Sequence, residues 1–317
     1  MAARAQLSAA VDTGLRKAIL AAADSGTVRR LVRRHGMRLG ASRFVAGETL
    51  DECVEVLRRL NQRGLHANTT LLGEGVRDRG ETAAVVDAYE EVIDRIAGEG
   101  LQANVALKLT HLGLEIDEEL AYANVRRLVE HAKAHRSFIR IDMEQAAFVD
   151  ATLRIYVRLR EEASLDNVGT VLQAYLHRTA ADLELLLPLA PNLRLVKGAY
   201  REPASMAYPA KADVDAAYAR LAERMLTGGG YTAIATHDES LIVHLLDYAR
   251  TNEVARDAFE LQMLYGVRPG LQSDLAGRGY KVLVATPYGP EWYPYLMRRL
   301  GERPANLVFF LRNAIRR

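Results

Sequence analysis

Two adjacent arginines stand near the carboxyl end of the chain, in the run EWYPYLMRR at 291–299. In a helix, Tyr295, Arg298 and Arg299 would share one face, because residues three and four positions apart lie side by side. Two guanidinium groups that converge on one point can bind a carboxylate or a phosphate through paired, charge-assisted hydrogen bonds. A solvated helix face with a weak Arg298–Glu302 ion pair fits the same spacing, and helix geometry alone leaves both interpretations open.

Further charged and amide side chains stand within runs of strand-forming residues. In QANVALKLT (102–110), strict alternation turns Lys108 away from the valine and leucine side, and in SFIRIDME (137–144) it does the same for Asp142 and Glu144. The other such candidates are Arg140, Gln173, Arg194 and Lys197. Strands of a parallel barrel are normally near-continuous apolar runs. Because an unpaired buried charge is costly, these groups must pair with one another or with a bound molecule.

Several of these polar groups lie toward the carboxyl ends of their strands, where β/α-barrel enzymes hold their active sites. For any single residue, a purely structural ion pair is the alternative interpretation. This interpretation becomes less convincing as the number of such residues grows. His237 in THDE (236–239) fits a metal ligand, a general base, a hydrogen-bond donor or a packed ring. His66 and His111 have no partners at metal-ligand spacing, so we expect no metal site.

The elements that would position these residues alternate along most of the chain. Eight β-rich runs, each followed by a stretch with helical spacing, lie at 66–74, 102–110, 137–144, 169–175, 193–198, 231–236, 258–264 and 281–286. This alternation predicts parallel strands joined by right-handed crossovers, and eight units fit a (β/α)8 barrel. An open doubly wound sheet is the competitor, but its Gly-x-Gly-x-x-Gly fingerprint is missing. We expect N-terminal helices over 1–65 and the catalytic barrel over 66–317.

Composition excludes several classes of function. The net charge is +2, from 42 basic and 40 acidic residues, which gives no case for a nucleic-acid partner. A single cysteine, Cys53, rules out an intrachain disulfide and a cysteine-built zinc site. Residues 1–40 hold eight Lys/Arg and two acidic residues. An organelle transit segment, a membrane-surface helix and an ordinary solvated amphipathic helix all fit that pattern, and the last is the simplest.

A family resemblance adds to this interpretation. The run YGPEWYPYLMRRLGERPANLVFFLRN resembles the C-terminal signature of the proline dehydrogenases, and the resemblance continues in family order through LLGEGV, ALKLTHLG, IRIDME, VLQAYL, RLVKGAY, IATHDE and FELQMLYG. It implies a barrel whose last helix lies over its top, with FAD as cofactor. It further implies oxidation of L-proline to 1-pyrroline-5-carboxylate, with hydride transfer to the flavin and electron delivery to a quinone. The implied location is cytoplasmic, with peripheral contact at the inner face of a membrane.

The resemblance also implies roles for individual residues. The substrate-binding positions are Lys108, Leu264, Arg298 and Arg299. Glu74 matches an acid that closes over the substrate by pairing with the first arginine. Asp142 and Arg194 match catalytic positions, with Arg194 beside the reactive flavin nitrogen. The flavin contacts are Met143, Gln173, Lys197, Gly198, Ala199, Thr236 and His237.

One position departs from the family pattern, and two other functions stay open. Many members carry a tyrosine where this chain has Ala285, in VATPYG. We expect the change to leave Asp142 short of a partner and to open space near ring carbon four, so that 4-hydroxyproline is tolerated. The alternatives are a barrel lyase or aldolase that uses Lys108 as a Schiff-base nucleophile, and a non-catalytic sensor of an amino acid or a flavin.

Overall fold

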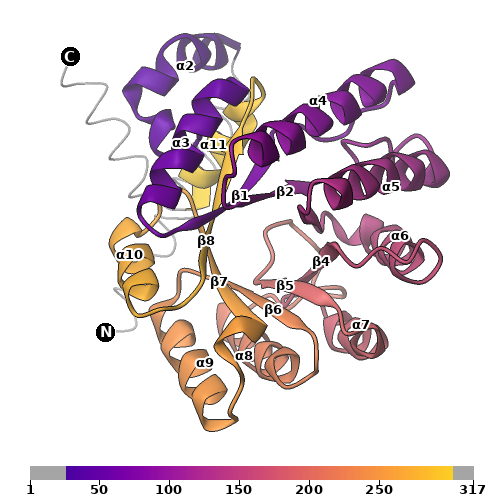
Figure 1. Cartoon of the computed structure of the whole chain (residues 1–317), viewed down its shortest axis with the longest axis vertical. Helices are drawn as coiled ribbons and strands as arrows, with labels where there is room; N and C mark the ends of the chain where they lie inside the picture. Colours follow the sequence, from indigo (N-terminus) through magenta and orange to yellow (C-terminus); the bar gives the residue numbers. More distant parts are fainter. Residues whose placement is uncertain (1–25, 303–317) are drawn as a thin grey trace.

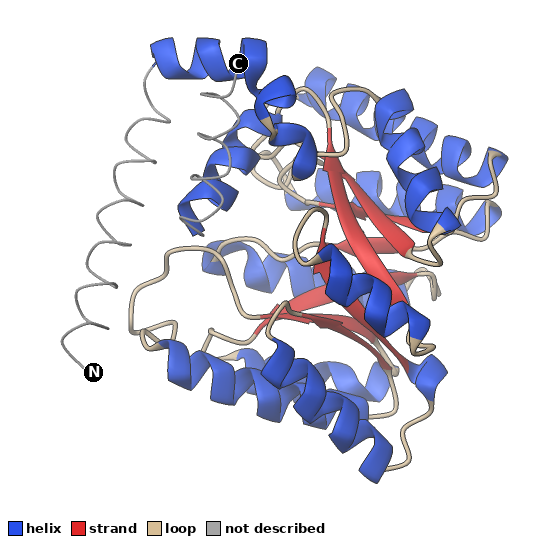
Figure 2. Ribbon diagram, turned by 90° about the vertical axis from the view of Figure 1, so that its left-hand side faces the viewer, coloured by secondary structure: helices blue, strands red, loops and turns tan. Residues whose placement is uncertain are grey.

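A closed barrel of eight parallel strands forms the centre of the computed structural model, which describes residues 26–302. The strands are β1 (His66–Leu71), β2 (Ala103–Leu107), β3 (Ile139–Ile141), β4 (Val168–Gln173), β5 (Asn192–Val196), β6 (Tyr231–Ala235), β7 (Phe259–Leu264) and β8 (Val282–Tyr288). Each pairs in parallel with its sequence neighbours, and β8 closes on β1. Figures 1 and 2 show the strands at the centre with helices around them. The predicted (β/α)8 fold is confirmed.

Helices cover the outside of the barrel and its mouth. They are α2 (Gly26–Leu39), α3 (Leu50–Gln62), α4 (Arg79–Gly98), α5 (Glu118–Ala134), α6 (Val149–Glu161), α7 (Thr179–Leu186), α8 (Lys211–Leu226), α9 (Glu239–Thr251), α10 (Pro269–Gly277) and α11 (Trp292–Glu302). The starts of α4 and α5 follow from capping aspartates: Asp78 accepts a hydrogen bond from the Glu81 backbone N–H, and Asp117 from that of Leu120, each at 2.9 Å.

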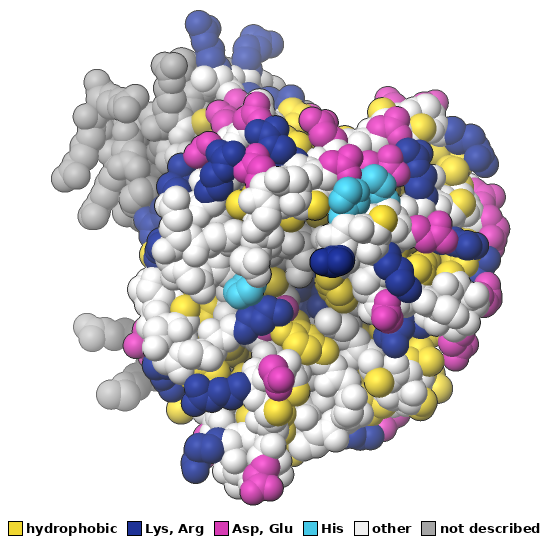
Figure 3. Space-filling view, viewed as in Figure 1, with side chains coloured by type: hydrophobic (Ala, Val, Ile, Leu, Met, Phe, Trp, Pro, Cys, Tyr) yellow, Lys and Arg dark blue, Asp and Glu magenta, His cyan; other side chains and the backbone are white. Residues whose placement is uncertain are grey.

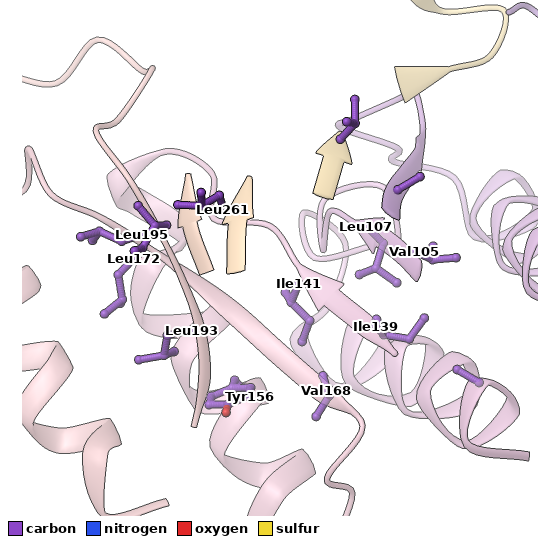
Figure 4. Close-up of a cluster of buried hydrophobic side chains, with 14 of the residues drawn as sticks. Val105, Leu107, Ile139, Ile141, Tyr156, Val168, Leu172, Leu193, Leu195 and Leu261 are labelled. Atoms are coloured by element: carbon purple, nitrogen blue, oxygen red, sulfur yellow. The ribbon is translucent and has the colours of Figure 1, made fainter. Parts of the chain in front are cut away.

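The main core lies between the strands and the surrounding helices. Val105, Leu107, Ile139 and Ile141 are fully buried there, and Figure 4 shows them among other apolar side chains of this layer. The alternation predicted for these two runs is therefore confirmed. On the opposite side, Arg140 is buried inside the barrel.

The guanidinium of Arg140 donates to two backbone carbonyls inside the barrel, that of Thr170 at 3.0 Å and that of Asn192 at 2.7 Å. A buried cation with such partners holds neighbouring strands together. Among the charged residues of the strands, Arg140 therefore has a structural role, which was the alternative to a place in the active site.

A second apolar cluster holds α11 in place. Its buried members are Ala41, Phe44, Val45, Leu72, Trp292, Tyr293, Leu296, Met297 and Leu300. Helix α2 packs closely on it, since a Cβ added at Gly36 would lie 2.7 Å from the Trp292 ring. Arg33 of α2 also bonds Glu291 at 2.7 Å. The aromatic residues of the C-terminal run therefore serve packing, which leaves the opposite face of α11 to carry the arginines.

The expected N-terminal helices are present over the described part of that segment. Helix α3 packs against β1 and β8, and the division into 1–65 and 66–317 stays a proposal. Within residues 26–302, no helix combines the length and apolar character needed to cross a bilayer. Residues 1–25 and 303–317 lie outside the described residues, and so does part of the basic N-terminal segment.

Candidate active site

A cavity of about 750 Å³ opens at the carboxyl ends of the strands. Ten of the predicted site residues line it: Met143, Gln173, Arg194, Lys197, Gly198, Ala199, Thr236, His237, Leu264 and Arg299. Ala285 is also in its wall. The volume lies within the range typical of small-molecule and cofactor sites. The structure therefore gathers most of the predicted residues, drawn from β3 to β7 or the segments just after them and from α11, around one space.

The other predicted residues, Glu74, Lys108, Asp142 and Arg298, are not among the residues that line the cavity, and each is held by an ion pair. Lys108, just past β2, donates to the Glu74 carboxylate, and Arg298 of α11 lies 3.4 Å from its second oxygen. Burial alone would raise the pKa of Glu74, but the charges of Lys108 and Arg298 outweigh it and lower that pKa. The expected Glu74–Arg298 contact is thus present, and Glu74 links the β2 lysine to the terminal helix.

Arg194 of β5 is held at two points inside the barrel. Its Nη1 donates to Asp142 Oδ1 and its Nη2 to Asn68 Oδ1, both at 2.7 Å. The arginine side chain is 9% exposed, so these two bonds fix the direction of a nearly buried cation. The expectation that Ala285 leaves Asp142 short of a partner is wrong, because the guanidinium reaches it across the barrel.

A network of two lysines and two aspartates borders the cavity between β5, β6 and α8. Lys197 Nζ lies 2.5 Å from Asp215 and 3.1 Å from Asp238, and Lys211 also bonds Asp215. Burial opposes ionisation of Asp215, yet hydrogen bonds from Lys197 and Lys211 outweigh it and lower the pKa of this carboxyl. The aspartates therefore hold both ammonium groups beside the cavity.

Gly198, directly after β5 and Lys197, occupies a conformation and a space that exclude other residues. Its φ is 114°, and a Cβ added there would lie 2.1 Å from a ring carbon of Tyr175. The Tyr175 backbone N–H also donates to the Lys197 carbonyl at 2.9 Å. The chain therefore passes tightly over the Tyr175 ring, with its backbone turned to the cavity.

His237 is fixed by the backbone of the next strand. Its Nε2 accepts a hydrogen bond from the Leu264 N–H at 2.8 Å, and its carbonyl accepts one from Arg268 at 2.9 Å. A neutral ring that accepts through Nε2 carries its proton on Nδ1. Of the roles that the sequence left open, this geometry disfavours metal ligation through Nε2.

Several residues of the cavity wall were not predicted from the sequence: Val196, Tyr200, Arg201, Lys211, Ala235, Asp238, Gln262 and Met263. Some of these residues could have been found from the sequence. Gln262, for example, is a polar residue between the buried Leu261 and Met263, and this alternation predicts that it faces inward. Lys211 could not have been found in this way. It begins α8 and comes beside Lys197 because both bind Asp215.

Comparison with known proteins adds an independent finding. The family model for proline dehydrogenase matches residues 53–312. Proline dehydrogenase 1 of Bacillus subtilis is 40% identical over 303 residues, which cover 96% of this chain and 100% of that protein. Proline dehydrogenase of Deinococcus radiodurans is 40% identical over 309 residues, covering 96% and 99%.

Among solved structures, that of proline utilization A from Bdellovibrio bacteriovorus, inactivated by N-propargylglycine, has a TM-score of 0.79 and 24% sequence identity. The match covers 87% of this chain and 34% of that chain. This chain therefore spans about a third of the length of that protein, and the likeness concerns the barrel fold.

Proposed function

The chain belongs to the proline dehydrogenase family, and from this premise we propose how the described site carries out the reaction. The protein is an FAD-dependent enzyme that oxidises L-proline, the first step of proline catabolism. One observation carries the assignment of roles. Arg299, an anion-binding group on the terminal helix, lines the same cavity as the positions assigned to the flavin. Substrate carboxylate and cofactor would therefore meet in one cavity.

The residues around the cavity fit FAD. We assign its contacts to Met143, Gln173, Lys197, Gly198, Ala199, Thr236 and His237. Gly198 lets the backbone line the cavity at a point where a Cβ would clash with the Tyr175 ring, and cationic groups suited to phosphates also line the cavity at Lys197 and Arg201. When bound, the flavin supplies the acceptor for the hydride of proline. The protein's part is to place the substrate ring and to exclude water.

The substrate is held by its carboxylate. Arg298 and Arg299 grip this group in our proposal, with Lys108 in support, and Leu264 walls the ring. Fixing the carboxylate and the ring of a small substrate turns binding energy into orientation, which is the largest contribution a protein makes to such a transfer. Glu74 already bridges Lys108 and Arg298, so an entering carboxylate must share these cations with it. This sharing is the basis for assigning Glu74 as the substrate gate.

Arg194 supplies fixed positive charge at the reacting centre. A preorganised cation stabilises charge that develops during the reaction without having to reorient. Asp142 and Asn68 hold the guanidinium in its direction, at 2.7 Å each. We therefore assign Arg194 as the catalytic cation. We expect Asp142 to contribute by holding the Arg194 guanidinium in its direction, in addition to its own position near the reacting centre.

A quinone is the proposed electron acceptor, and the proposed location is cytoplasmic with peripheral membrane contact. Helix α2 supports the contact, because Arg30 and Arg34 are exposed on it. Clustered cations of this kind attract anionic lipid surfaces.

The proposed function has a direct test. The purified protein, supplied with FAD, should show a flavin absorption spectrum and should reduce an artificial electron acceptor when L-proline is added. Binding of proline without turnover would favour the sensor. Borohydride trapping of a carbonyl substrate would favour the Schiff-base enzyme, although Lys108 is already engaged by a carboxylate. A colourless protein after incubation with FAD would contradict the assignment.

Ala285 should set the tolerance for 4-hydroxyproline. It pairs in register with Leu264, the assigned wall of the proline pocket, and it lines the same cavity. A small residue there leaves room for a ring hydroxyl, so Ala285→Tyr should lower kcat/KM for 4-hydroxyproline relative to L-proline by roughly tenfold or more. Steady-state kinetics on both substrates measures this ratio. If the ratio is the same in both proteins, Ala285 does not control the choice.

A further inference from the structure

Three metal-binding side chains meet on the outside of the barrel, between α4 and α5. Asp94 belongs to α4, His131 lies in the last turn of α5, and His135 caps that helix. The two histidines are four residues apart and therefore project from one helix face, one turn apart. Their Nε2 atoms lie 2.6 Å and 3.1 Å from the same oxygen, Oδ1 of Asp94. The two ring centroids are 4.9 Å apart.

The neighbouring contacts between α4 and α5 follow a different rule. One turn earlier on α5, Arg127 donates to Glu90 at 2.6 Å and to Asp87 at 3.0 Å. One cation with several donors thus serves two carboxylates there. At Asp94 the numbers are reversed, since two imidazole rings contact a single carboxylate oxygen. An ordinary ion pair needs one donor, and a second charged ring so close would add repulsion. A metal cation coordinated by both neutral imidazole rings and by the carboxylate would avoid this repulsion between two charged rings.

The separations suit a transition-metal ion. Zn²⁺ binds histidine nitrogen at about 2.0–2.1 Å and carboxylate oxygen at about 2.0–2.2 Å, so ligand atoms of a tetrahedral site lie about 3.3–3.5 Å apart. All three ligand atoms already lie within 4.8 Å of one another. The shorter contacts need to open by less than about 1 Å, and side-chain rotation can supply that movement because Asp94 is 54% and His135 36% exposed.

We propose that Asp94, His131 and His135 form a binding site for a divalent transition-metal ion of the Zn²⁺ class, with water completing the coordination. Imidazole and carboxylate ligands are the set that such ions accept. Figure 3 shows histidine beside acidic side chains on the surface over α4 and α5. The site lies near the carboxyl-terminal ends of α4 and α5, at the opposite end of the barrel from the cavity. A bound ion would therefore link the two helices and stabilise the fold, and it would take no part in proline oxidation. The sequence alone does not reveal this site, because the third ligand comes from another helix.

The test measures metal binding directly. Full-length protein without a histidine tag, loaded with FAD and treated with a chelator that is then removed, is titrated calorimetrically with ZnCl₂. One Zn²⁺ per chain should bind at this site, and the event should disappear in the His131→Ala/His135→Ala double variant. Each single replacement should weaken binding at least about tenfold, since even loss of an outer partner costs roughly 10–100-fold. Zn²⁺ should also raise the melting temperature of the wild type and not of the double variant.

Two further variants sharpen the result. His244→Ala is the matched control, because His244 Nε2 also lies 2.6 Å from one carboxylate oxygen, that of Glu223. It should bind Zn²⁺ as the wild type does. Asp94→Asn nearly preserves the shape of the side chain, so it should weaken binding while flavin content and proline turnover stay unchanged. Equal Zn²⁺ affinity and stoichiometry in the wild type, the double variant and Asp94→Asn would overturn the proposal, whatever the outcome for proline oxidation.

Discussion

Replacing Arg299 by methionine should lower kcat/KM for L-proline by roughly 10- to 150-fold while the protein keeps its flavin. The reason is that a hydrogen bond to a charged group contributes about 1.5–3 kcal/mol, which corresponds to that range. Methionine preserves apolar bulk beside Tyr295, over whose ring the guanidinium lies at 5.4 Å. The loss should appear mainly in KM, because the carboxylate anchor acts in the bound ground state as well as in the transition state. Steady-state kinetics with an artificial acceptor, together with the flavin-to-protein absorbance ratio, measures both quantities.

The matched control for this variant is Arg278→Met. Arg278 also lies over a tyrosine ring, that of Tyr280, at 5.5 Å, and it is absent from the cavity wall. Its replacement removes the same charge and the same kind of ring contact, so kinetics and flavin content should match the wild type. Parallel loss of flavin and of activity in Arg299→Met would instead assign Arg299 a role in folding.

Much of the barrel could be predicted from the sequence because its signals are local. All eight strands begin within two residues of the predicted runs. Most end earlier than predicted, since the polar residues at the ends of the runs leave the sheet. Lys108 and Asp142 are examples, as each stands just past the last residue of its strand. The alternation of residues along the runs was enough to predict that these side chains point toward the barrel interior.

Contacts between distant segments could not be predicted in the same way. The sequence places Arg194 and Asp142 on the inner side of their strands, but it does not show that one guanidinium reaches both Asp142 and Asn68. The expectation that Asp142 is left short of a partner failed for this reason. Likewise, helix spacing left the role of Arg298 and Arg299 undecided. The packing of Trp292 against α2 fixes the rotation of α11 and places Arg299 in the cavity wall, while Arg298 pairs with Glu74. That the two arginines bind the substrate carboxylate stays a proposal.

Gly198→Ala should release most of the FAD, with affinity at least about tenfold weaker, because the methyl group cannot fit. Its Cβ would lie 2.1 Å from the Tyr175 ring, and the ring is only 8% exposed, so it has little room to move. The positive φ of 114° adds backbone strain of about 1–3 kcal/mol for a residue other than glycine. The segment after β5 must then shift, and it carries Lys197 and Ala199 with it. Titration of the apoprotein with FAD, followed by flavin fluorescence, measures the change in affinity.

Gly229→Ala separates this steric effect from backbone strain. Gly229 also has a positive φ, of 82°, but a Cβ added there meets no atom within 4 Å. It lies before β6, at the amino end of that strand and away from the cavity. Strain without a clash should lower the melting temperature slightly and leave FAD affinity at the wild-type value. If both variants lost FAD equally, global destabilisation would explain the result. If Gly198→Ala bound FAD normally, the backbone after β5 would not form part of the flavin site.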